Sequence, residues 1–275
     1  MARQKIVFIG GGNMARSLVG GLVADGHPAA SIRVTDPTPE QRQALADRFG
    51  IETAADNAEA VADADVVVLA VKPQVMREVA TALGPALAQR RPLVVSIAAG
   101  IRERDLRRWL GYEGPIVRCM PNTPSLLQSG ITALYPNEHA DEAQRDSAES
   151  ILRAVGTVIW LDDESLMDTV TAVSGGGPAY FFLFIESLEA AAVARGLAED
   201  KARLLAIETA LGAARMALES ADDPATLRAN VTSRGGTTAE ALGVFEREGL
   251  RDMVDRAIGA AAGRAAELGD QLGAD

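Results

Sequence analysis

The hydrophobic residues in the first part of the chain gather in short runs, most of which show no alternation with polar positions. The runs are KIVFIG at 5–10, IRVTD at 32–36, VVVLAV at 66–71, LVVSIA at 93–98, IVRCM at 116–120 and GTVIWL at 156–161. Continuous apolar runs are typical of strands covered on both faces, and helical stretches between them favour parallel pairing. The pattern therefore predicts an α/β domain built on a parallel sheet.

The pattern changes near Glu164. From there onward no strand-like run remains, and alanine-rich helical patterns continue to the end of the chain. A length of 275 residues also suits about two domains. We therefore predict an α/β domain over residues 1–162 and an all-α domain over residues 163–275.

Two segments of the helical part are apolar around most of their circumference. They are PAYFFLFIESLEAAAVARG, which begins at Pro178, and EDKARLLAIETALGAARMALES, which begins at Glu199. A domain of about a hundred residues has too little interior to hide two such helices, so we expect a second copy of the chain to cover them. The alternative is a compact helical bundle with its own core.

Composition narrows the range of partners. The formal net charge of −11 argues against nucleic acid, because binding phosphate backbones requires clustered Lys and Arg. No run reaches the ~18 apolar residues that span a bilayer, so no membrane association is expected. The single cysteine, Cys119, cannot form an internal disulfide, and the chain starts without a secretory signal. These features predict a cytoplasmic protein.

A glycine-rich turn follows the first apolar run. In KIVFIGGGNMARSLVGGL, the residues Gly10, Gly12 and Ala15 form the pattern G-x-G-x-x-A between a strand and an amphipathic helix. The first glycine allows the tight turn, the second allows a pyrophosphate to approach the backbone, and the alanine allows helix and strand to pack closely. This context predicts a dinucleotide site in a doubly wound sheet.

The end of the second strand bears on which dinucleotide binds. Asp36 lies near the distance of about 20 residues at which an acidic residue binds the adenosine ribose, and its charge favours NAD over NADP. Thr35, Thr38 and Arg42 surround it and form a possible 2′-phosphate pocket if the carboxylate turns away. A third interpretation is an Asx turn with Pro37. The residues leave this choice open.

Three further segments follow predicted strands. They are AVKPQ at 70–74, SIAAGI at 96–101 and MPNTP at 120–124. Ligands of doubly wound sheets lie at the carboxyl ends of the strands, and small or proline-containing segments let a flat cofactor approach the backbone. Loops bounded by proline are also common without any ligand.

Residues that accept protons are scarce. Oxidation of an alcohol by a nicotinamide requires a base, but His27 and His139 lie in expected loops, and Lys72 is the one lysine at the ligand edge of the sheet. An imine needs less, because its nitrogen can enter already protonated. The chain is therefore better suited to reducing an imine than to oxidising an alcohol.

The stretch VTSRGGTTAEAL, from Val231, interrupts the helical region with two glycines and two threonines. Thr237 precedes Glu240 by three residues, which predicts a capping box with Gly235 and Gly236 as a turn before the helix. The amides at such a helix start attract anions, so a small carboxylate could bind there beside the Thr238 hydroxyl. The alternative is a capped helix with no ligand.

A second glycine cluster, SGGGPAYFF at 174–182, precedes the first long apolar helix. It allows close backbone approach, and Pro178 suits the first turn of a helix. By itself the cluster indicates a hinge between the domains.

Together these segments resemble the pyrroline-5-carboxylate reductases. The likeness runs over nearly the whole chain through FIGGGNMA, AVKPQ, SIAAGI, MPNTP, SGGGPAY and, most particular to the family, VTSRGGTT. The resemblance implies an N-terminal Rossmann-type doubly wound sheet followed by an all-α dimerisation domain that intertwines with a second subunit, with dimers that can form a decamer. It implies NADPH- or NADH-dependent reduction of 1-pyrroline-5-carboxylate to L-proline.

The resemblance also implies roles for single residues. Thr238 would face the ring nitrogen as hydrogen-bond partner or proton donor. The substrate carboxylate would be held by Ser233, Gly235, Gly236 and Thr237, largely through backbone amides. The cofactor would be bound by Gly10, Gly12, Asn13, Met14, Thr35, Asp36, Ala70, Val71, Lys72, Pro73, Ala98 and Asn122. No metal site is expected.

Four positions depart from the common family pattern. Gly176 stands where Ser is usual, Arg234 where Pro or Lys is frequent, Glu208 where Gln is common, and Pro37 where many bacterial members carry a basic residue. The first loses a hydroxyl near the domain junction. Glu208 adds a charge to a helix expected to be largely buried, and Pro37 leaves the preference between NADP and NAD open.

Two other functions compete with this interpretation. A dehydrogenase acting on 3-hydroxy acids would carry a lysine in the first long interdomain helix, and PAYFFLFIESLEAAAVAR has none. A nucleotide-sensing module would bind NAD(P)H without turnover.

Overall fold

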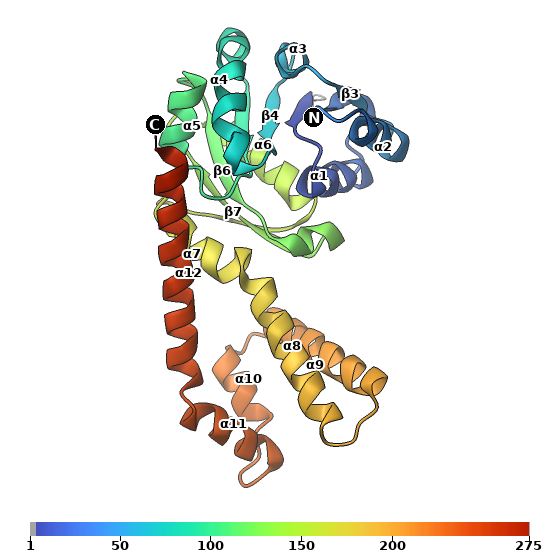
Figure 1. Cartoon of the computed structure of the whole chain (residues 1–275), viewed down its shortest axis with the longest axis vertical. Helices are drawn as coiled ribbons and strands as arrows, with labels where there is room; N and C mark the ends of the chain where they lie inside the picture. Colours follow the sequence, from blue (N-terminus) through green and yellow to red (C-terminus); the bar gives the residue numbers. More distant parts are fainter. Residues whose placement is uncertain (1–3, 275) are drawn as a thin grey trace. The chain divides into compact units, whose positions relative to one another are not determined.

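The computed structural model describes residues 4–274 (Figure 1). Contacts between residues group the chain into two compact units. The first comprises the residues up to Gly176 together with those from Ala261 onward, and the second is Gly177–Ala260. The change of unit after Gly176 falls within the glycine cluster from which the sequence predicts a hinge. The domain boundary after residue 162 stays a prediction.

The first unit contains an eight-stranded sheet with the order β3-β2-β1-β4-β5-β6-β7-β8. Its strands are β1 (Ile6–Ile9), β2 (Ile32–Thr35), β3 (Glu52–Ala54), β4 (Val66–Leu69), β5 (Leu93–Ser96), β6 (Ile116–Met120), β7 (Gly130–Pro136) and β8 (Gly156–Trp160). Neighbouring strands are parallel, except that β7 is antiparallel to β6. Every apolar run expected as a strand is one.

The sequence pattern missed β3 and β7, and the expected parallel pairing does not hold between β6 and β7. β3 is a short edge strand whose residues are not buried, so it carries no apolar run. β7 reads GITALYP, in which glycine, threonine and proline dilute the apolar signal. Only the short 3₁₀ helix η2 (Thr123–Leu127) separates it from β6, and a parallel return would need a longer crossover.

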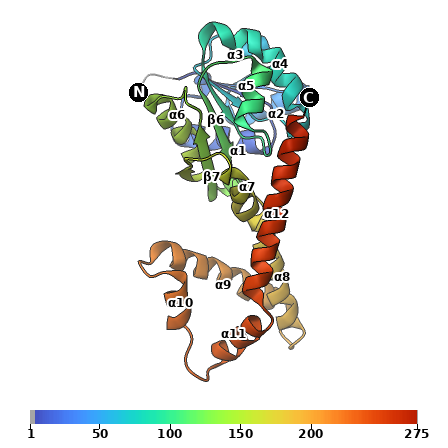
Figure 2. The ribbon, with the colours of Figure 1, turned by 90° about the vertical axis from the view of Figure 1, so that its left-hand side faces the viewer.

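Helices cover both faces of this sheet (Figure 2). They are α1 (Asn13–Ala24), α2 (Pro39–Phe49), α3 (Asn57–Val61), α4 (Pro73–Arg90), α5 (Glu103–Leu110), α6 (Glu142–Arg153) and α7 (Leu166–Val170), with the 3₁₀ helix η1 (Ala29–Ser31) and the π-helix η3 (Thr171–Gly175). Phe8 of β1 packs in a cluster with residues of α1 and α6, while Val7 and Ile9 join a cluster with α4 and α5. Alternate residues of a strand face opposite sides of the sheet, so the side chains of one apolar run are divided between two hydrophobic clusters.

The second unit is helical. It comprises α8 (Gly177–Val193), α9 (Glu199–Glu219), α10 (Pro224–Asn230), α11 (Thr237–Arg247) and the first part of α12 (Leu250–Gly273). As the sequence predicts, Pro178 lies in the first turn of α8, and Glu199 and Asp200 lie in that of α9. Asp223 caps α10 by accepting a hydrogen bond from Thr226 N at 2.9 Å.

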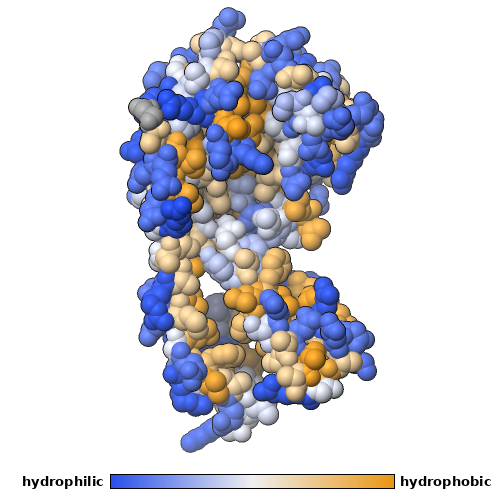
Figure 3. Space-filling model, in the orientation of Figure 1, coloured by the Kyte–Doolittle hydropathy of each residue, from blue (hydrophilic) through white to orange (hydrophobic). Residues whose placement is uncertain are grey.

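This unit buries almost nothing by itself. Gly177, Ala202 and Ala206 are its buried residues, and all three are small. Large apolar side chains are instead exposed, including Phe181, Phe182, Leu183, Leu204, Leu205, Leu211, Met216 and Leu218. Apolar surface also lies over these helices in the space-filling view (Figure 3). The sequence left open that these helices form a compact bundle with its own core. The described residues of this unit form no such core.

The last turns of α12 pack in the first unit. Ala265 and Gly269 are buried there. The guanidinium of Arg102, the N-cap of α5, forms an ion pair with Asp270 at 2.6 Å and donates to Ala266 O at 3.3 Å. The chain thus leaves the first unit after Gly176 and returns to it at Ala261. Among residues 4–274, no helix combines the length and the apolar character that a membrane span requires.

Candidate active site

The turn after β1 requires glycine at its first position. Gly10 adopts φ +102°, and a Cβ built on it would lie 2.8 Å from the carbonyl oxygen of Ala70. Its amide donates to Thr35 O at 2.9 Å, and Ala70 N donates to Ile9 O at 2.8 Å. These bonds join the carboxyl ends of β1, β2 and β4, which is the edge where doubly wound sheets bind ligands.

The start of α1 has open space and amides without acceptors in the helix. Gly12 is the N-cap of α1, and no side chain caps this helix. A Cβ built on Gly12 would meet nothing within 4 Å. The amides of Asn13 and Met14 lie in the first turn, where the helix dipole favours an anion. Ala15 is buried, as close packing of helix on strand requires. The turn therefore fits the pyrophosphate of a dinucleotide.

Asp36 follows β2 and connects the glycine turn to the next loop. Its Oδ2 accepts a hydrogen bond from Gly11 N at 3.0 Å, and its Oδ1 accepts one from Thr38 N at 2.9 Å. The second bond is the Asx turn that was one interpretation of the sequence. A Cβ on Gly11 would lie 2.8 Å from Leu45 Cδ1 and 3.3 Å from Asp36 Oδ2. Gly11 was not among the residues predicted from the sequence, although the run of three glycines was a signal.

Thr35 lies beneath this surface. Its side chain is buried, and its hydroxyl donates to Asn57 Oδ1, in the first residue of α3, at 2.6 Å. Thr35 therefore fixes the loop after β3, and its direct contact with the cofactor stays a prediction. No motif in the sequence pointed to Asn57.

The residues expected to bind the cofactor after β4 are Ala70, Val71, Lys72 and Pro73. Lys72 is exposed and is the N-cap of α4, and Pro73 is the first residue of that helix. Ala98 is buried after β5, the strand that pairs with β4. Both segments therefore lie at the same edge of the sheet as Gly10.

Asn122, which follows β6, has a buried side chain with both ends bonded. Its Oδ1 accepts from Ile131 N at 3.0 Å, and its Nδ2 donates to Ser174 O at 3.2 Å. It therefore joins β6 to β7 and to η3, where a Cβ on Gly175 would lie 2.6 Å from the terminal methyl of Met120. The close backbone approach expected of the second glycine cluster at the junction of the domains stays a prediction. The role of Asn122 near the nicotinamide stays a prediction.

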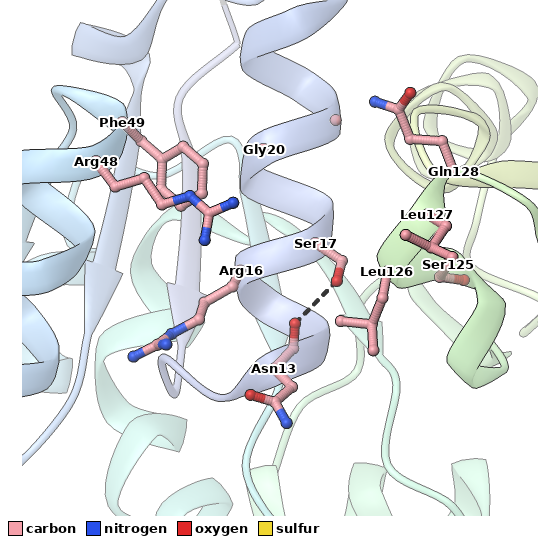
Figure 4. A pocket seen from close by; sticks show the side chains of 11 residues that line it. Asn13, Arg16, Ser17, Gly20, Arg48, Phe49, Ser125, Leu126, Leu127 and Gln128 are labelled. Carbon is pink, nitrogen blue, oxygen red and sulfur yellow. Dashed lines mark hydrogen bonds between the residues drawn. The ribbon is translucent and has the colours of Figure 1, made fainter.

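A cavity of about 500 Å³ runs beside α1 (Figure 4). Its lining consists of Asn13, Arg16, Ser17, Gly20, Gly21, Arg48, Phe49, Ser125, Leu126, Leu127 and Gln128. Among the residues expected to bind the cofactor, Asn13 is the one member of this lining. The cavity extends from Asn13 to Gly21, eight residues or about 12 Å along the helix. It therefore lies next to the expected dinucleotide edge and not over it.

The residues expected to bind the substrate lie in the second unit, at the start of α11. Gly235 adopts φ +70°, and Gly236 N donates to Ser233 O at 3.0 Å, so both glycines form the expected turn before the helix. A Cβ on Gly236 would collide with Ser233 Oγ. Thr237 and Thr238 are exposed in the first turn. Their amides lack acceptors in the helix, which suits a carboxylate.

The predicted capping box at Thr237 is wrong. The N-cap is Gly236, α11 begins at Thr237, and no side chain caps the helix. Glu240 N donates to Gly236 O at 3.2 Å, so the helix begins one residue earlier than a capping box between Thr237 and Glu240 requires. Two consecutive threonines left this register ambiguous, and the extended backbone of Gly236 (φ −84°, ψ 170°) decides it. The uncapped start leaves more amides for a ligand than a capping box would.

This correction leads to a stability prediction. Thr237→Ala is expected to leave the free energy of unfolding within about 0.5 kcal/mol of the unsubstituted protein, because no cap is lost. Asp141→Ala is the matched control, since Asp141 forms a complete capping box with Gln144 at the start of α6. Its loss should cost about 1 kcal/mol. Urea unfolding of both variants checks this, and equal losses would restore a capping role for Thr237.

Three of the departures from the family pattern can be placed. Gly176 is the C-cap of η3, has helical backbone angles and donates its amide to Thr171 O at 2.9 Å. Arg234 is exposed in the turn before α11, and Glu208 is exposed on α9. The helix that carries Glu208, α9, was expected to be largely buried, but most of its residues are exposed in a single chain.

The histidines lie in loops, as expected. His27 Nε2 lies 3.2 Å from Gln4 O, and His139 Nε2 lies 3.6 Å from a carboxylate oxygen of Glu113.

Comparison with known proteins finds a matching family model in each unit. Residues 164–268 match the family model for pyrroline-5-carboxylate reductase dimerisation, and residues 5–100 match the model for NADP oxidoreductase, coenzyme F420-dependent. The chain is 53% identical over 273 residues to a pyrroline-5-carboxylate reductase of Pseudomonas aeruginosa, covering 99% of this chain and 100% of that protein.

Solved structures agree with these sequence comparisons. A pyrroline-5-carboxylate reductase from Coxiella burnetii superposes with a TM-score of 0.94 at 45% identity, covering 97% of this chain and 98% of the other. A pyrroline carboxylate reductase from Plasmodium falciparum with NADP bound gives 0.86 at 29% identity, covering 98% and 99%. With a glycine turn that fits a dinucleotide, an uncapped helix start and relatives that match from end to end, the chain belongs to the pyrroline-5-carboxylate reductase family.

Proposed function

We propose that this protein is a pyrroline-5-carboxylate reductase, which uses NADH or NADPH to reduce the C=N bond of 1-pyrroline-5-carboxylate to L-proline. The observation that carries the proposal is the 53% identity to a reductase of this name over 99% of the chain. That span includes both the glycine turn and the start of α11. The scarcity of proton acceptors, noted in the sequence, is consistent with an imine substrate.

The start of α11 binds the substrate carboxylate. The amide of Thr237 presents an N–H group at a helix N-terminus, and the turn before it is shaped by Ser233, Gly235 and Gly236, whose own amide donates to Ser233 O. A carboxylate gains there from charge-assisted hydrogen bonds and from the helix dipole. An acidic protein can in this way hold a small acid without a dedicated arginine.

Thr238 acts at the ring nitrogen of the substrate. Its exposed side chain lies next to the amides that hold the carboxylate, so its hydroxyl is the hydrogen-bond partner of the nitrogen of the same small ring and accepts from that nitrogen when it enters protonated. When bound, the reduced nicotinamide supplies the hydride that the C=N carbon accepts. The protein then has to orient the ring and hold one proton at nitrogen, which a hydroxyl suffices to do.

The residues at the carboxyl edge of the sheet bind the cofactor. Gly10, Gly12, Asn13 and Met14 hold the pyrophosphate, and Asp36 faces the adenosine ribose. Ala70, Val71, Lys72, Pro73 and Ala98 line the edge beyond the glycine turn. Asn122 and Thr35, whose polar atoms are bonded within the protein, act by fixing the loops.

The protein forms homo-oligomers, as the dimerisation model over residues 164–268 indicates. The dimer forms through the C-terminal helices, because the exposed apolar residues of α8 and α9 lack a core in their own chain. We extend this to an assembly of dimers, with a decamer as the form expected. We place the protein in the cytoplasm.

Initial rates with both cofactors test the function. Purified protein should oxidise NADH or NADPH in proportion to added 1-pyrroline-5-carboxylate, and it should not reduce NAD or NADP with a 3-hydroxy acid. Binding of NADH without oxidation would instead support the nucleotide-sensing alternative. Turnover of the hydroxy acid would support the competing dehydrogenase.

A further inference from the structure

The carboxylate of Asp36 is fixed in one position. It is half-buried at the end of β2, and each of its oxygens accepts a backbone amide: Gly11 N at 3.0 Å and Thr38 N at 2.9 Å. The two donors come from different loops, so turning the side chain away would leave two amides unpaired. The alternative in which Asp36 rotates out to admit a 2′-phosphate therefore requires breaking both bonds.

The charge of Asp36 is not neutralised by a neighbouring cation. Within residues 4–274, no Lys, Arg or His nitrogen lies within ion-pair distance of this carboxylate. Arg42 is close, but its Nη1 donates to the main-chain oxygens of Asp36 at 2.7 Å and of Pro37 at 3.1 Å. Its guanidinium thus supports the backbone of the turn. Pro37 stands where a basic side chain could have neutralised this carboxylate.

The fixed carboxylate lies beside the glycine turn that fits the pyrophosphate. Its bond to Gly11 N places it one residue from Gly12, where a Cβ would meet nothing within 4 Å. An adenosine ribose in that space presents its 2′ position to the end of β2. A ribose hydroxyl can donate to Asp36, whereas a 2′-phosphate brings a like charge against it.

We infer that Asp36, held by Gly11 and Thr38, makes NADH the preferred cofactor over NADPH. The inference rests on the proposed function only in that the protein uses a nicotinamide cofactor. Like charges placed together at a binding site weaken binding strongly, so the discrimination should be about tenfold or more in dissociation constant. Asp36 acts as a specificity-determining residue at a position away from the hydride.

Binding measurements on the full-length oligomer test this without turnover. Isothermal titration is carried out with NADH, NADPH, ADP-ribose and 2′-phospho-ADP-ribose on the unsubstituted protein, Asp36→Asn and Asp36→Ser. The unsubstituted protein should bind each unphosphorylated ligand at least about tenfold more tightly than its phosphorylated counterpart. Both substitutions should lower this ratio by about tenfold or more, because the charge is removed.

A matched control removes a carboxylate elsewhere. Asp141 also accepts a backbone amide, from Gln144 N at 2.8 Å, and Asn caps a helix as well as Asp does. Asp141→Asn should leave all four dissociation constants within about twofold. Melting temperatures identify any variant that fails to fold, and the two substitutions at Asp36 differ in volume, so one folded variant suffices.

The inference is overturned if the unsubstituted protein binds NADPH as tightly as NADH, or if folded variants at Asp36 leave the ratio unchanged. Its failure differs from that of the proposed function. A protein that discriminates between the ligands but shows no oxidation with 1-pyrroline-5-carboxylate contradicts the function alone. One that turns over this substrate without discriminating contradicts the role of Asp36 alone.

Discussion

Gly10→Ala is expected to abolish measurable binding of NADH and to lower the free energy of unfolding by about 3 kcal/mol. The backbone at Gly10 has φ +102°, which is strained for any side chain, and the new methyl would lie 2.8 Å from Ala70 O. Strain of this kind costs about 1–3 kcal/mol, and overpacking adds a similar amount. The methyl would also displace the turn from Ala70, and with it the amides that face the pyrophosphate.

Gly26→Ala is the matched control for this prediction. Gly26 also has a positive φ, of +86°, but a Cβ there would meet nothing within 4 Å. It should therefore lose only the strain energy, about 1–2 kcal/mol, and bind NADH normally. Urea unfolding and calorimetric titration measure the two effects. If Gly10→Ala bound NADH as well as Gly26→Ala does, the turn would not be the pyrophosphate site.

Thr238→Ala is expected to lower kcat by about 100-fold, because a side chain positioned to exchange a proton with the reacting group typically contributes 10²–10⁴-fold. Its stability should not fall. The Thr238 side chain is exposed and caps nothing, and alanine is the better helix former. The result expected is therefore a folded, substrate-binding protein with slow turnover.

Thr238→Ser separates the hydroxyl from the rest of the side chain. It keeps the donor and should recover most of the rate that alanine loses. Steady-state rates at saturating cofactor, with KM for 1-pyrroline-5-carboxylate measured in parallel, distinguish a loss of turnover from a loss of binding. An alanine variant with unchanged kcat would show that the amides of α11 act without the hydroxyl.

The sequence predicted the strands that carry an apolar run and missed β3 and β7, which do not. β1, β4 and β5 are hydrophobic throughout because helices cover both faces, so their runs are unmistakable. β3 lies at the edge and β7 follows a short turn, and neither needs a continuous apolar run. The reversal at β7 depends on the length and shape of the connection, which hydrophobicity does not encode.

In the candidate site, too, the sequence predicted some features and missed others. Local chemistry was enough to find Gly10, because tight turns demand glycine whatever surrounds them. The bond from Gly11 to Asp36 joins residues 25 positions apart, so no local pattern indicates it. The start of α11 was found from its glycines and threonines, but its register was misassigned by one residue. Helix caps depend on single backbone angles, and a repeated threonine leaves these undetermined.

The return of α12 also has a consequence for the order in which the protein is made. Arg102 is synthesised well before its partners Ala266 and Asp270, which follow it by 164 and 168 residues. The nucleotide-binding half cannot complete its packing until α12 has been synthesised. A message truncated before codon 261 would yield a nascent chain that exposes this contact surface, a natural target for quality control.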